Sequence, residues 1–318
     1  MSSGKNFGKI LAGAGVLALG SLAWGTLVER KLFTLREQTL PILPAGAEPL
    51  RVLHISDLHL APWQDAKIDW LRLLAGVKPD LIINTGDNVG HPDALPALKR
   101  ALGPLAGIPG VFVNGSNDYF GPVPKNPLSY FSSKKVSRPA ARLDSEGMRD
   151  FFVEELGWLD LNNEAAVIDL SDLRIEFMGV DDPHIHRDKT VELAIKLDDL
   201  RAELEPPAGS LGQITLGVTH APYQRILNTF LTNGAQAIFA GHTHGGQVRI
   251  PGMRSAIVTN CDIPASAARG LSIWHHARRS AYLSVSAGLG TSIYAPFRFA
   301  CLPEVTLATL VPEGSETV

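Results

Sequence analysis

The segment that most constrains this chain is Gly241-His242-Thr243-His244-Gly245-Gly246, which follows the mostly apolar run 235–240. Two histidines separated by one residue and flanked by glycines predict a tight turn with both imidazoles facing one cleft. A lone His-x-His is weak evidence for a metal site. Three other apolar runs also end in Asp or His, at 53–59, 81–88 and 216–220. Because sites in open α/β sheets form at the carboxyl ends of strands, we expect these four ends to converge.

Length and charge narrow the class of protein. With 318 residues and 45% hydrophobic content, the chain can bury a large core, and the spread of the polar strand ends favours one globular domain. A net charge of -3 gives no general attraction to nucleic acid, so we expect no nucleic-acid partner. Nothing indicates an obligate oligomer, so a monomer is expected. The two cysteines, Cys261 and Cys301, exclude a disulfide scaffold or a thiolate zinc site and are expected to pack without pairing.

The N-terminus differs in composition from the rest of the chain. Residues 10–28 form an uncharged, mostly apolar run of 19 residues, long enough for one membrane-spanning helix. We therefore expect a single-pass membrane anchor at residues 1–31. Cleavage as a signal peptide after small residues near Ser21-Leu22-Ala23 and a soluble amphipathic segment remain alternatives. Basic residues on both flanks leave the side of the membrane undetermined. The prolines of residues 32–49 predict a linker, followed by one domain at 50–312.

Strands and helices are expected to alternate after residue 50, which is typical of a layered α/β fold. The expected strands are 50–56, 81–84, 111–114, 166–170, 174–180, 213–219, 235–240, 247–250, 281–286 and 304–310. The expected helices are 65–74, 93–105, 145–156, 188–204 and 223–233. Residues 119–142 resemble an insertion, basic from 121 to 143 without an acidic residue. This segment is either a solvated loop or a cover that binds an anionic substrate or membrane surface.

The strand ends offer a mixed oxygen and nitrogen ligand set. Such ligands suit manganese, iron or zinc, and the absence of thiolates argues against a structural zinc site. A pair of divalent ions needs a carboxylate between them, and Asp87 is the candidate bridge. Two ions about 3.5 to 4 Å apart can share a hydroxide and hold a phosphoryl group for in-line attack.

Five ordered motifs resemble the calcineurin-like metallophosphoesterase family, and most of all its bacterial membrane-associated branch of single-domain phosphodiesterases. The motifs are Ile55-Ser56-Asp57-Leu58-His59-Leu60, Thr85-Gly86-Asp87, Gly115-Ser116-Asn117-Asp118, Thr219-His220-Ala221-Pro222 and Gly241-His242-Thr243-His244-Gly245-Gly246-Gln247. The resemblance covers about residues 50–310. It implies a β-sandwich of two mixed sheets flanked by helices, with two metal ions at the strand ends.

The resemblance also implies a role for each matching residue. Asp57, His59 and His244 would hold the first metal. His220 and His242 would hold the second, and Asp87 would bridge. The family adds an Asn ligand and a catalytic His from a Gly-Asn-His-Asp/Glu turn. Here a strict alignment places Ser116 at the Asn position and Asn117 at the His position. Either Asn117 reaches the second metal by a shift of one residue, or Ser116 or water binds it.

The usual catalytic histidine is therefore missing from its place, and Asp87 and Asn117 are the candidate catalytic residues. His184 and His186 follow a strand end and offer one alternative source of a proton. Asn88, His91 and Asp118 are the candidate substrate-binding residues.

The leading hypothesis is a membrane-tethered hydrolase of phosphodiester or pyrophosphate bonds, acting on a substrate that is lipid-linked or close to the membrane. The alternatives are a metal-binding or ligand-binding protein without turnover, and a nuclease.

Overall fold

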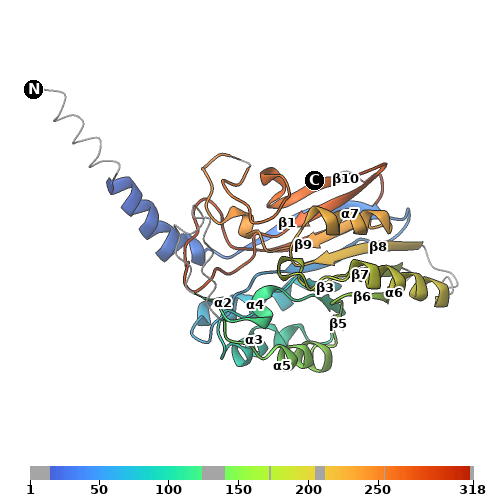
Figure 1. The fold of residues 1–318 in the computed structure, drawn as a ribbon, viewed down its shortest axis with the longest axis horizontal. Coiled ribbons are helices and arrows are strands. Elements are labelled where there is room, and N and C mark those ends of the chain that lie inside the picture. The colour runs from blue at the N-terminus through green and yellow to red at the C-terminus, as the bar shows by residue number, and fades with distance from the viewer. Residues whose placement is uncertain (1–14, 124–139, 172, 205–211, 254, 316–318) are drawn as a thin grey trace, which may run out of the picture.

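Two mixed sheets form the body of the protein, as seen in a computed structural model that describes residues 15–123, 140–171, 173–204, 212–253 and 255–315 (Figure 1). Within these residues each sheet has six strands, in the orders β1-β12-β2-β3-β4-β5 and β10-β11-β9-β8-β7-β6. The strands are β1 (Thr34–Leu43), β2 (Leu50–Ile55), β3 (Leu81–Asn84), β4 (Gly110–Phe112), β5 (Leu159–Asp160), β6 (Glu164–Leu170), β7 (Leu173–Gly179), β8 (Gly212–Thr219), β9 (Ala237–Ala240), β10 (Gly270–His276), β11 (Arg279–Val285) and β12 (Glu304–Pro312).

Helices cover the outer faces of the sandwich, as expected for an α/β fold. They are α2 (Asp65–Arg72), α3 (Leu95–Leu102), α4 (Ser116–Tyr119), α5 (Ser145–Asp150), α6 (Thr190–Glu203) and α7 (Gln224–Thr232). Shorter 3-10 and π turns are η1 (Trp24–Val28), η2 (Glu29–Lys31), η3 (Leu73–Val77), η4 (Gly103–Leu105), η6 (Phe151–Glu155), η7 (Pro183–Ile185), η8 (His244–Gly246) and η9 (Ala265–Ala267). The five helices predicted from the sequence are therefore present, with shorter bounds.

Alternation of side chains along the strands creates three apolar layers. In β3, Leu81 and Ile83 pack between the sheets, whereas Ile82 packs on the opposite face. The central layer also takes Phe177 of β7 and Phe239 of β9. Helices α2, α3 and α5 pack on the outer face of the first sheet, and α6 and α7 pack on the second. The two cysteines are free, as predicted.

The expected linker at 32–49 is wrong, because residues Thr34–Leu43 form β1. This strand pairs in parallel with β12 over its whole length, and its register shifts between Pro41 and Leu43. A proline is tolerated there because β1 is the edge strand of its sheet. The folded domain therefore starts before residue 50.

Two further expectations differ from the structure. Residues 247–250 do not form a strand; Val248 makes only an isolated bridge with Phe299. Strand β10 was not predicted; its side chains alternate between partly buried and exposed, and the exposed ones include Leu271 and Ile273. The basic segment 119–142 lies largely outside the described residues, from 124 to 139.

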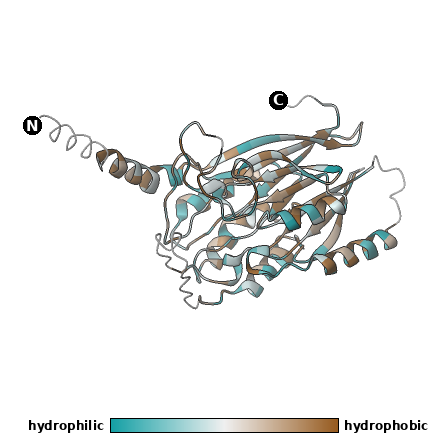
Figure 2. Ribbon diagram, turned by 45° about the horizontal axis from the view of Figure 1, so that its top comes forward, coloured by the Kyte–Doolittle hydropathy of each residue, from teal (hydrophilic) through white to brown (hydrophobic). Residues whose placement is uncertain are grey.

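The N-terminal helix projects away from the sandwich (Figure 1) and is largely apolar (Figure 2). Its side chains include Val16, Leu17 and Leu19, each about 70% exposed. Residues 1–14 of the predicted anchor are outside the described part of the chain. In the part that is described, no helix combines the length and hydropathy needed to cross a bilayer.

Candidate metal centre

The predicted ligands lie at the carboxyl ends of strands from both sheets. Residues after β2, β3 and β4 come from the first sheet, whereas those after β8 and β9 come from the second. Strands β2, β3 and β4 run parallel to one another, and so do β8 and β9. Their ends therefore meet at one edge of the sandwich, as the strand-end pattern predicted.

The backbone at this edge is unusual. Five candidate ligands have φ angles in the left-handed region: Asp57 (49°), His59 (40°), Asp87 (55°), His242 (67°) and His244 (49°). Non-glycine residues adopt this region rarely, and each occurrence costs of the order of 1–3 kcal/mol. Such a cluster is held only where the surrounding packing fixes it, which is typical of a functional site.

Asp57, His59 and His244 form the first half-site. The His59 Nε2 and His244 Nε2 atoms face each other at 3.3 Å. The Asp57 Oδ1 atom lies 3.7 Å from His244 Nε2 and 4.0 Å from His59 Nε2. Asp57 Oδ2 is already bonded, to Ser56 Oγ at 2.5 Å and to the His242 N–H at 2.9 Å. One oxygen and two nitrogens thus point to a common place.

His220 and His242 form the second half-site. The His242 Nδ1 atom lies 3.1 Å from His220 Nε2. The His220 Nδ1 atom is 2.8 Å from the Thr85 carbonyl, so Nδ1 carries a proton and Nε2 is the nitrogen that faces the other candidate ligands. This bond to a carbonyl is the usual way of orienting a metal-binding imidazole.

Asp87 lies between the two half-sites. Its Oδ2 atom is 3.4 Å from His59 Nε2 and 3.6 Å from His220 Nε2. Candidate ligand atoms of Asp57, Asp87 and His220 also fall within 4.8 Å of one another. This is the position that the predicted bridging carboxylate requires.

The donor set fits divalent cations. Asp57 Oδ1 is buried without a hydrogen-bond partner within the described residues, which costs free energy unless a cation pairs with it. Burial lowers the pKa of His59 to about 3 and also lowers the pKa of His244, so both remain neutral ligands. Burial acts in the same direction on His220, yet the charges of Asp87, Asp182 and Asp57 raise its pKa to about 9. The site therefore concentrates negative charge that a bound cation would neutralise.

Comparison with known proteins identifies the family. The sequence profile of the calcineurin-like phosphoesterase family matches residues 50–246, more than half of the chain. The chain belongs to this family. It is accordingly a phosphoester hydrolase of a dimetal-dependent family, and its Asp and His cluster is placed to bind metal.

Curated relatives agree with this assignment. The uncharacterized metallophosphoesterase YkuE of Bacillus subtilis is 25% identical over 96% of this chain and 94% of its own length. The phosphodiesterase YaeI of Escherichia coli is 26% identical over 88% of both chains. Among solved structures, a dimetal phosphatase from Danio rerio aligns with a TM-score of 0.39 and 11% identity, over 76% of this chain and 88% of that one.

The turn that departs from the calcineurin-like pattern is tied to the bridging carboxylate. The Asn117 backbone N–H donates to Asp87 Oδ1 and its side-chain Nδ2 donates to Asp87 Oδ2, both at 2.7 Å. Gly115 is required here because a Cβ would lie 2.3 Å from Asp87 Oδ1 and 2.7 Å from the His220 ring. Asn117, rather than Ser116, therefore makes the contacts of this turn with Asp87.

Two of the three predicted substrate-binding residues are buried and hydrogen-bonded within the protein. Asp118 is buried, and its carboxylate accepts hydrogen bonds from the backbone of Gly115, Asp87 and Asn88. Asn88 is also buried and bonded to Asn84 and Asp118. Both residues hold the ligand loops in place. His91 is partly exposed, with Trp63 packed edge-on against its ring.

The loop after β7 contributes residues that the sequence left open. The His184 ring centroid lies 4.4 Å from that of His242, and its Nδ1 is 3.0 Å from the Tyr223 hydroxyl. Asp182, which was not singled out from the sequence, is buried, and its Oδ2 has no hydrogen-bond partner among the described residues. Its position directly after a strand end was the signal that could have identified it.

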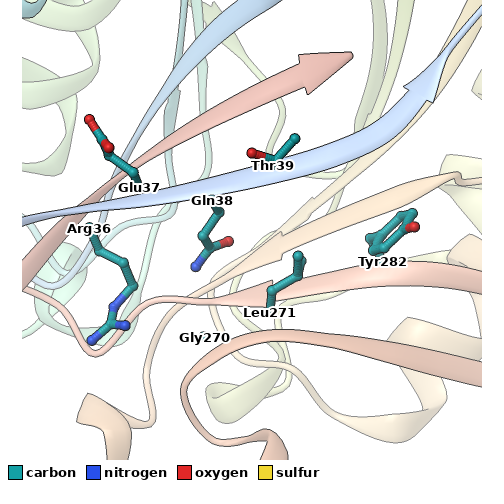
Figure 3. Close-up of a pocket in the computed structure, with 7 residues that line it drawn as sticks. All are labelled: Arg36, Glu37, Gln38, Thr39, Gly270, Leu271 and Tyr282. Atoms are coloured by element: carbon teal, nitrogen blue, oxygen red, sulfur yellow. The ribbon is translucent and has the colours of Figure 1, made fainter. Parts of the chain in front are cut away.

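A separate pocket of about 390 Å³ lies between β1 and the β10–β11 hairpin. Arg36 and Gln38 point from β1 toward β10, whereas Glu37 and Thr39 point to the other side of the strand (Figure 3). None of its lining residues belongs to the Asp and His cluster. The chemistry is therefore assigned to the ligand cluster.

Proposed function

We propose that this calcineurin-like phosphoesterase hydrolyses phosphodiester or pyrophosphate bonds at a centre of two divalent ions. The position of Asp87 carries the proposal, because one of its carboxylate oxygens is within 3.6 Å of a histidine nitrogen in each half-site. A single-ion site would have no use for a carboxylate shared in this way.

Each ligand residue has a defined task. Asp57, His59 and His244 would hold one ion, and His220, His242 and Asn117 the other, with Asp87 common to both. When bound, a pair of manganese, iron or zinc ions supplies an activated water and neutralises phosphoryl charge. The Thr85 carbonyl keeps His220 in the tautomer that can bind metal. Asp118 fixes the backbone of Asp87 through a 2.7 Å hydrogen bond.

Asn117 favours substrates with a good leaving group. An amide cannot act as a general acid, a role that contributes about 10²- to 10⁴-fold in other enzymes. The rate of hydrolysis should then fall steeply as the pKa of the leaving alcohol rises. Esters whose leaving group is an aryl oxide or a phosphate depend least on this missing proton.

The membrane is the proposed location of the substrate. The exposed apolar side chains of residues 15–28 support a role as a membrane anchor, with the catalytic domain close to the bilayer. A lipid-linked phosphoester or a nucleotide-sugar pyrophosphate near the membrane fits this position. Co-flotation of the full chain with phospholipid vesicles tests the anchor, and loss of flotation after Leu17→Asp and Leu19→Asp would support it.

The decisive experiment measures hydrolysis of an aryl phosphodiester and the matching monoester by the full chain loaded with manganese. The full chain is needed because β1 lies before residue 50. We expect faster turnover of the diester, and loss of this turnover in Asp87→Asn. Equal or faster hydrolysis of the monoester would contradict the proposed preference.

The altered turn at Asn117 favours a second candidate function, in which the protein binds a ligand without turnover. Two bound metals with no hydrolysis of either ester would support it. Rapid cleavage of nucleic acid by the metal-loaded chain would instead support a nuclease.

A further inference from the structure

The end of the N-terminal helix, Trp24–Lys31, is docked on the loop of residues 297–301. Gly25 lies so close to this loop that a Cβ would be 2.3 Å from the Phe297 ring, and its carbonyl accepts a hydrogen bond from the Arg298 backbone N–H at 3.2 Å. The Glu29 side chain is buried, and its Oε1 accepts a hydrogen bond from the Cys301 backbone N–H at 2.7 Å. A carboxylate removed from water in this way indicates a specific contact.

Arg298 binds the neighbouring loop through its guanidinium. The side chain is fully buried, and one terminal nitrogen donates to the carbonyls of Ala287, Gly288 and Gly290 at 2.7, 2.9 and 2.7 Å. The other terminal nitrogen is 3.3 Å from the Cys301 carbonyl. Because a guanidinium is a rigid donor fork, these bonds fix the turn after β11 in one conformation.

Both loops contact the first half-site directly. The Gly290 N–H donates to the Asp57 carbonyl at 2.6 Å. The Cys301 Sγ is 3.3 Å from the His244 carbonyl. Glu29 is thus connected to His244 through Cys301, and Arg298 is connected to Asp57 through Gly290. In the second half-site, the Thr85 carbonyl orients His220, and the Asp118 carboxylate holds the backbone of the bridging Asp87.

We propose that Glu29 and Arg298 are positioning residues for the first half-site, so that docking of the N-terminal helix sets the metal affinity of Asp57, His59 and His244. These three ligands have left-handed backbone conformations, which persist only where neighbouring contacts hold them. Glu29 and Arg298 supply such contacts from outside the ligand set. The inference rests on the proposed two-metal centre and adds that one half of it depends on the helix.

Manganese titration of the full chain tests this coupling, with electron paramagnetic resonance used to count free and bound ions. We expect Glu29→Ala and Arg298→Met to weaken one of the two manganese equivalents by about 10- to 100-fold, as changes behind metal ligands do elsewhere. The other equivalent should keep its wild-type affinity. His244→Ala identifies the equivalent that belongs to the first half-site.

Conservative variants separate positioning from folding. Glu29→Gln retains an acceptor oxygen for the Cys301 N–H, so its affinity should lie between those of wild type and Glu29→Ala. If the alanine or methionine variants do not fold, Glu29→Gln and Arg298→Lys decide the question. Arg201→Met is the matched control, because Arg201 pairs with buried Glu176 in the middle of β7, away from the ligand loops. It should leave both equivalents unchanged.

Two results would overturn the proposal. In the first, both equivalents keep wild-type affinity in folded Glu29 and Arg298 variants. In the second, both equivalents weaken together in step with thermal stability, which would assign these residues a purely structural role. A wild-type chain that binds no manganese would overturn the two-metal centre itself, a failure distinct from either of these.

Discussion

The two half-sites of the metal centre are built from different parts of the chain. The first depends on segments from both ends of the sequence, because the loops at 287–290 and 297–301 hold Asp57 and His244. The second is assembled from strand ends and the turn at 115–118, where Asp118 and Thr85 fix the ligands. The first matches the family motif in full, whereas the second carries the Asn117 replacement. Contacts with residues 287–301 thus support the regular half-site, whereas hydrogen bonds among the strand-end loops support the divergent one.

The largest loss of activity is expected when a metal ligand is removed, which we test with one single variant in each half-site. His242→Ala and His244→Ala change residues of the same turn that belong to different half-sites. Each variant should retain one of two metals and lose more activity than the roughly 10- to 100-fold typical of residues behind the ligands. Metal analysis combined with kcat/KM for the aryl diester checks this. Loss of both metals in either variant would mean that the half-sites do not bind independently.

Gly115→Ala should come next, because it affects the bridging Asp87 and His220 of the second half-site. The added Cβ would lie 2.3 Å from Asp87 Oδ1 and 2.7 Å from the His220 ring, so the turn must move. We expect about a 100-fold loss of kcat/KM, corresponding to about 3 kcal/mol. Gly76→Ala is the control, since a Cβ there meets nothing within 4 Å. Wild-type activity in Gly115→Ala would show that the turn can relax without cost.

Asn117→Ala should have a smaller effect. The substitution removes the 2.7 Å hydrogen bond from Nδ2 to Asp87 Oδ2 but keeps the bond from the backbone N–H. We expect about a 10-fold weaker second metal and an unchanged first metal. Manganese titration distinguishes the two equivalents. An unchanged second equivalent would argue that Asn117 is not a ligand.

Lys67→Met is expected to have the smallest effect on activity. It tests a contact that supports the first half-site, and its effect is measured on the free energy of unfolding. The Lys67 Nζ is buried and donates to the Leu58 carbonyl at 2.8 Å. Burial, reinforced by the charges of Arg298 and Arg30, lowers its pKa from 10.5 to about 7. As pH falls, Lys67 therefore takes up a proton in the unfolded chain before it does so in the folded chain. The contribution of neutral Lys67 to the free energy of unfolding is lost as pH falls from 10.5 to about 7.

The variant lacks this titration. Its free energy of unfolding should rise relative to wild type as pH falls from 10 to 7, by at most about 1.4 kcal/mol per pH unit. Urea unfolding at several pH values measures the difference. Lys189→Met, at an exposed lysine, is the control. A difference between Lys67→Met and wild type that does not vary with pH would contradict a titrating lysine at this position.

The core strands and the ligand set were predictable because the residues that indicate them are adjacent in the sequence. Strand β3 consists of three apolar residues and Asn84, followed at once by Thr85-Gly86-Asp87, and its bounds match the prediction. Strand β1 was missed because it depends on pairing with a strand that is distant in the sequence. Its partner β12 lies at the other end of the sequence, and Pro41 suggested a linker although an edge strand accepts proline.

The roles of polar residues were harder to predict than their positions. Asp118 was expected to face substrate, yet its oxygens are occupied by backbone N–H groups. Arg298 gave no recognisable pattern because its partners are carbonyl groups, which any sequence provides. Neither outcome is determined by residue type, because both depend on how distant loops pack.

The pairing of β1 with β12 has a consequence for the order in which the protein matures. Thr34 and Pro303, which are hydrogen-bonded across these strands, are 269 positions apart. During synthesis β1 leaves the ribosome early and has no sheet partner until residues 304–312 follow. Glu29 and Gly25 likewise meet residues 297–301 only at this stage. The first half-site is therefore completed last, because the nascent chain can form its full metal centre only after residues 297–312 have been synthesised.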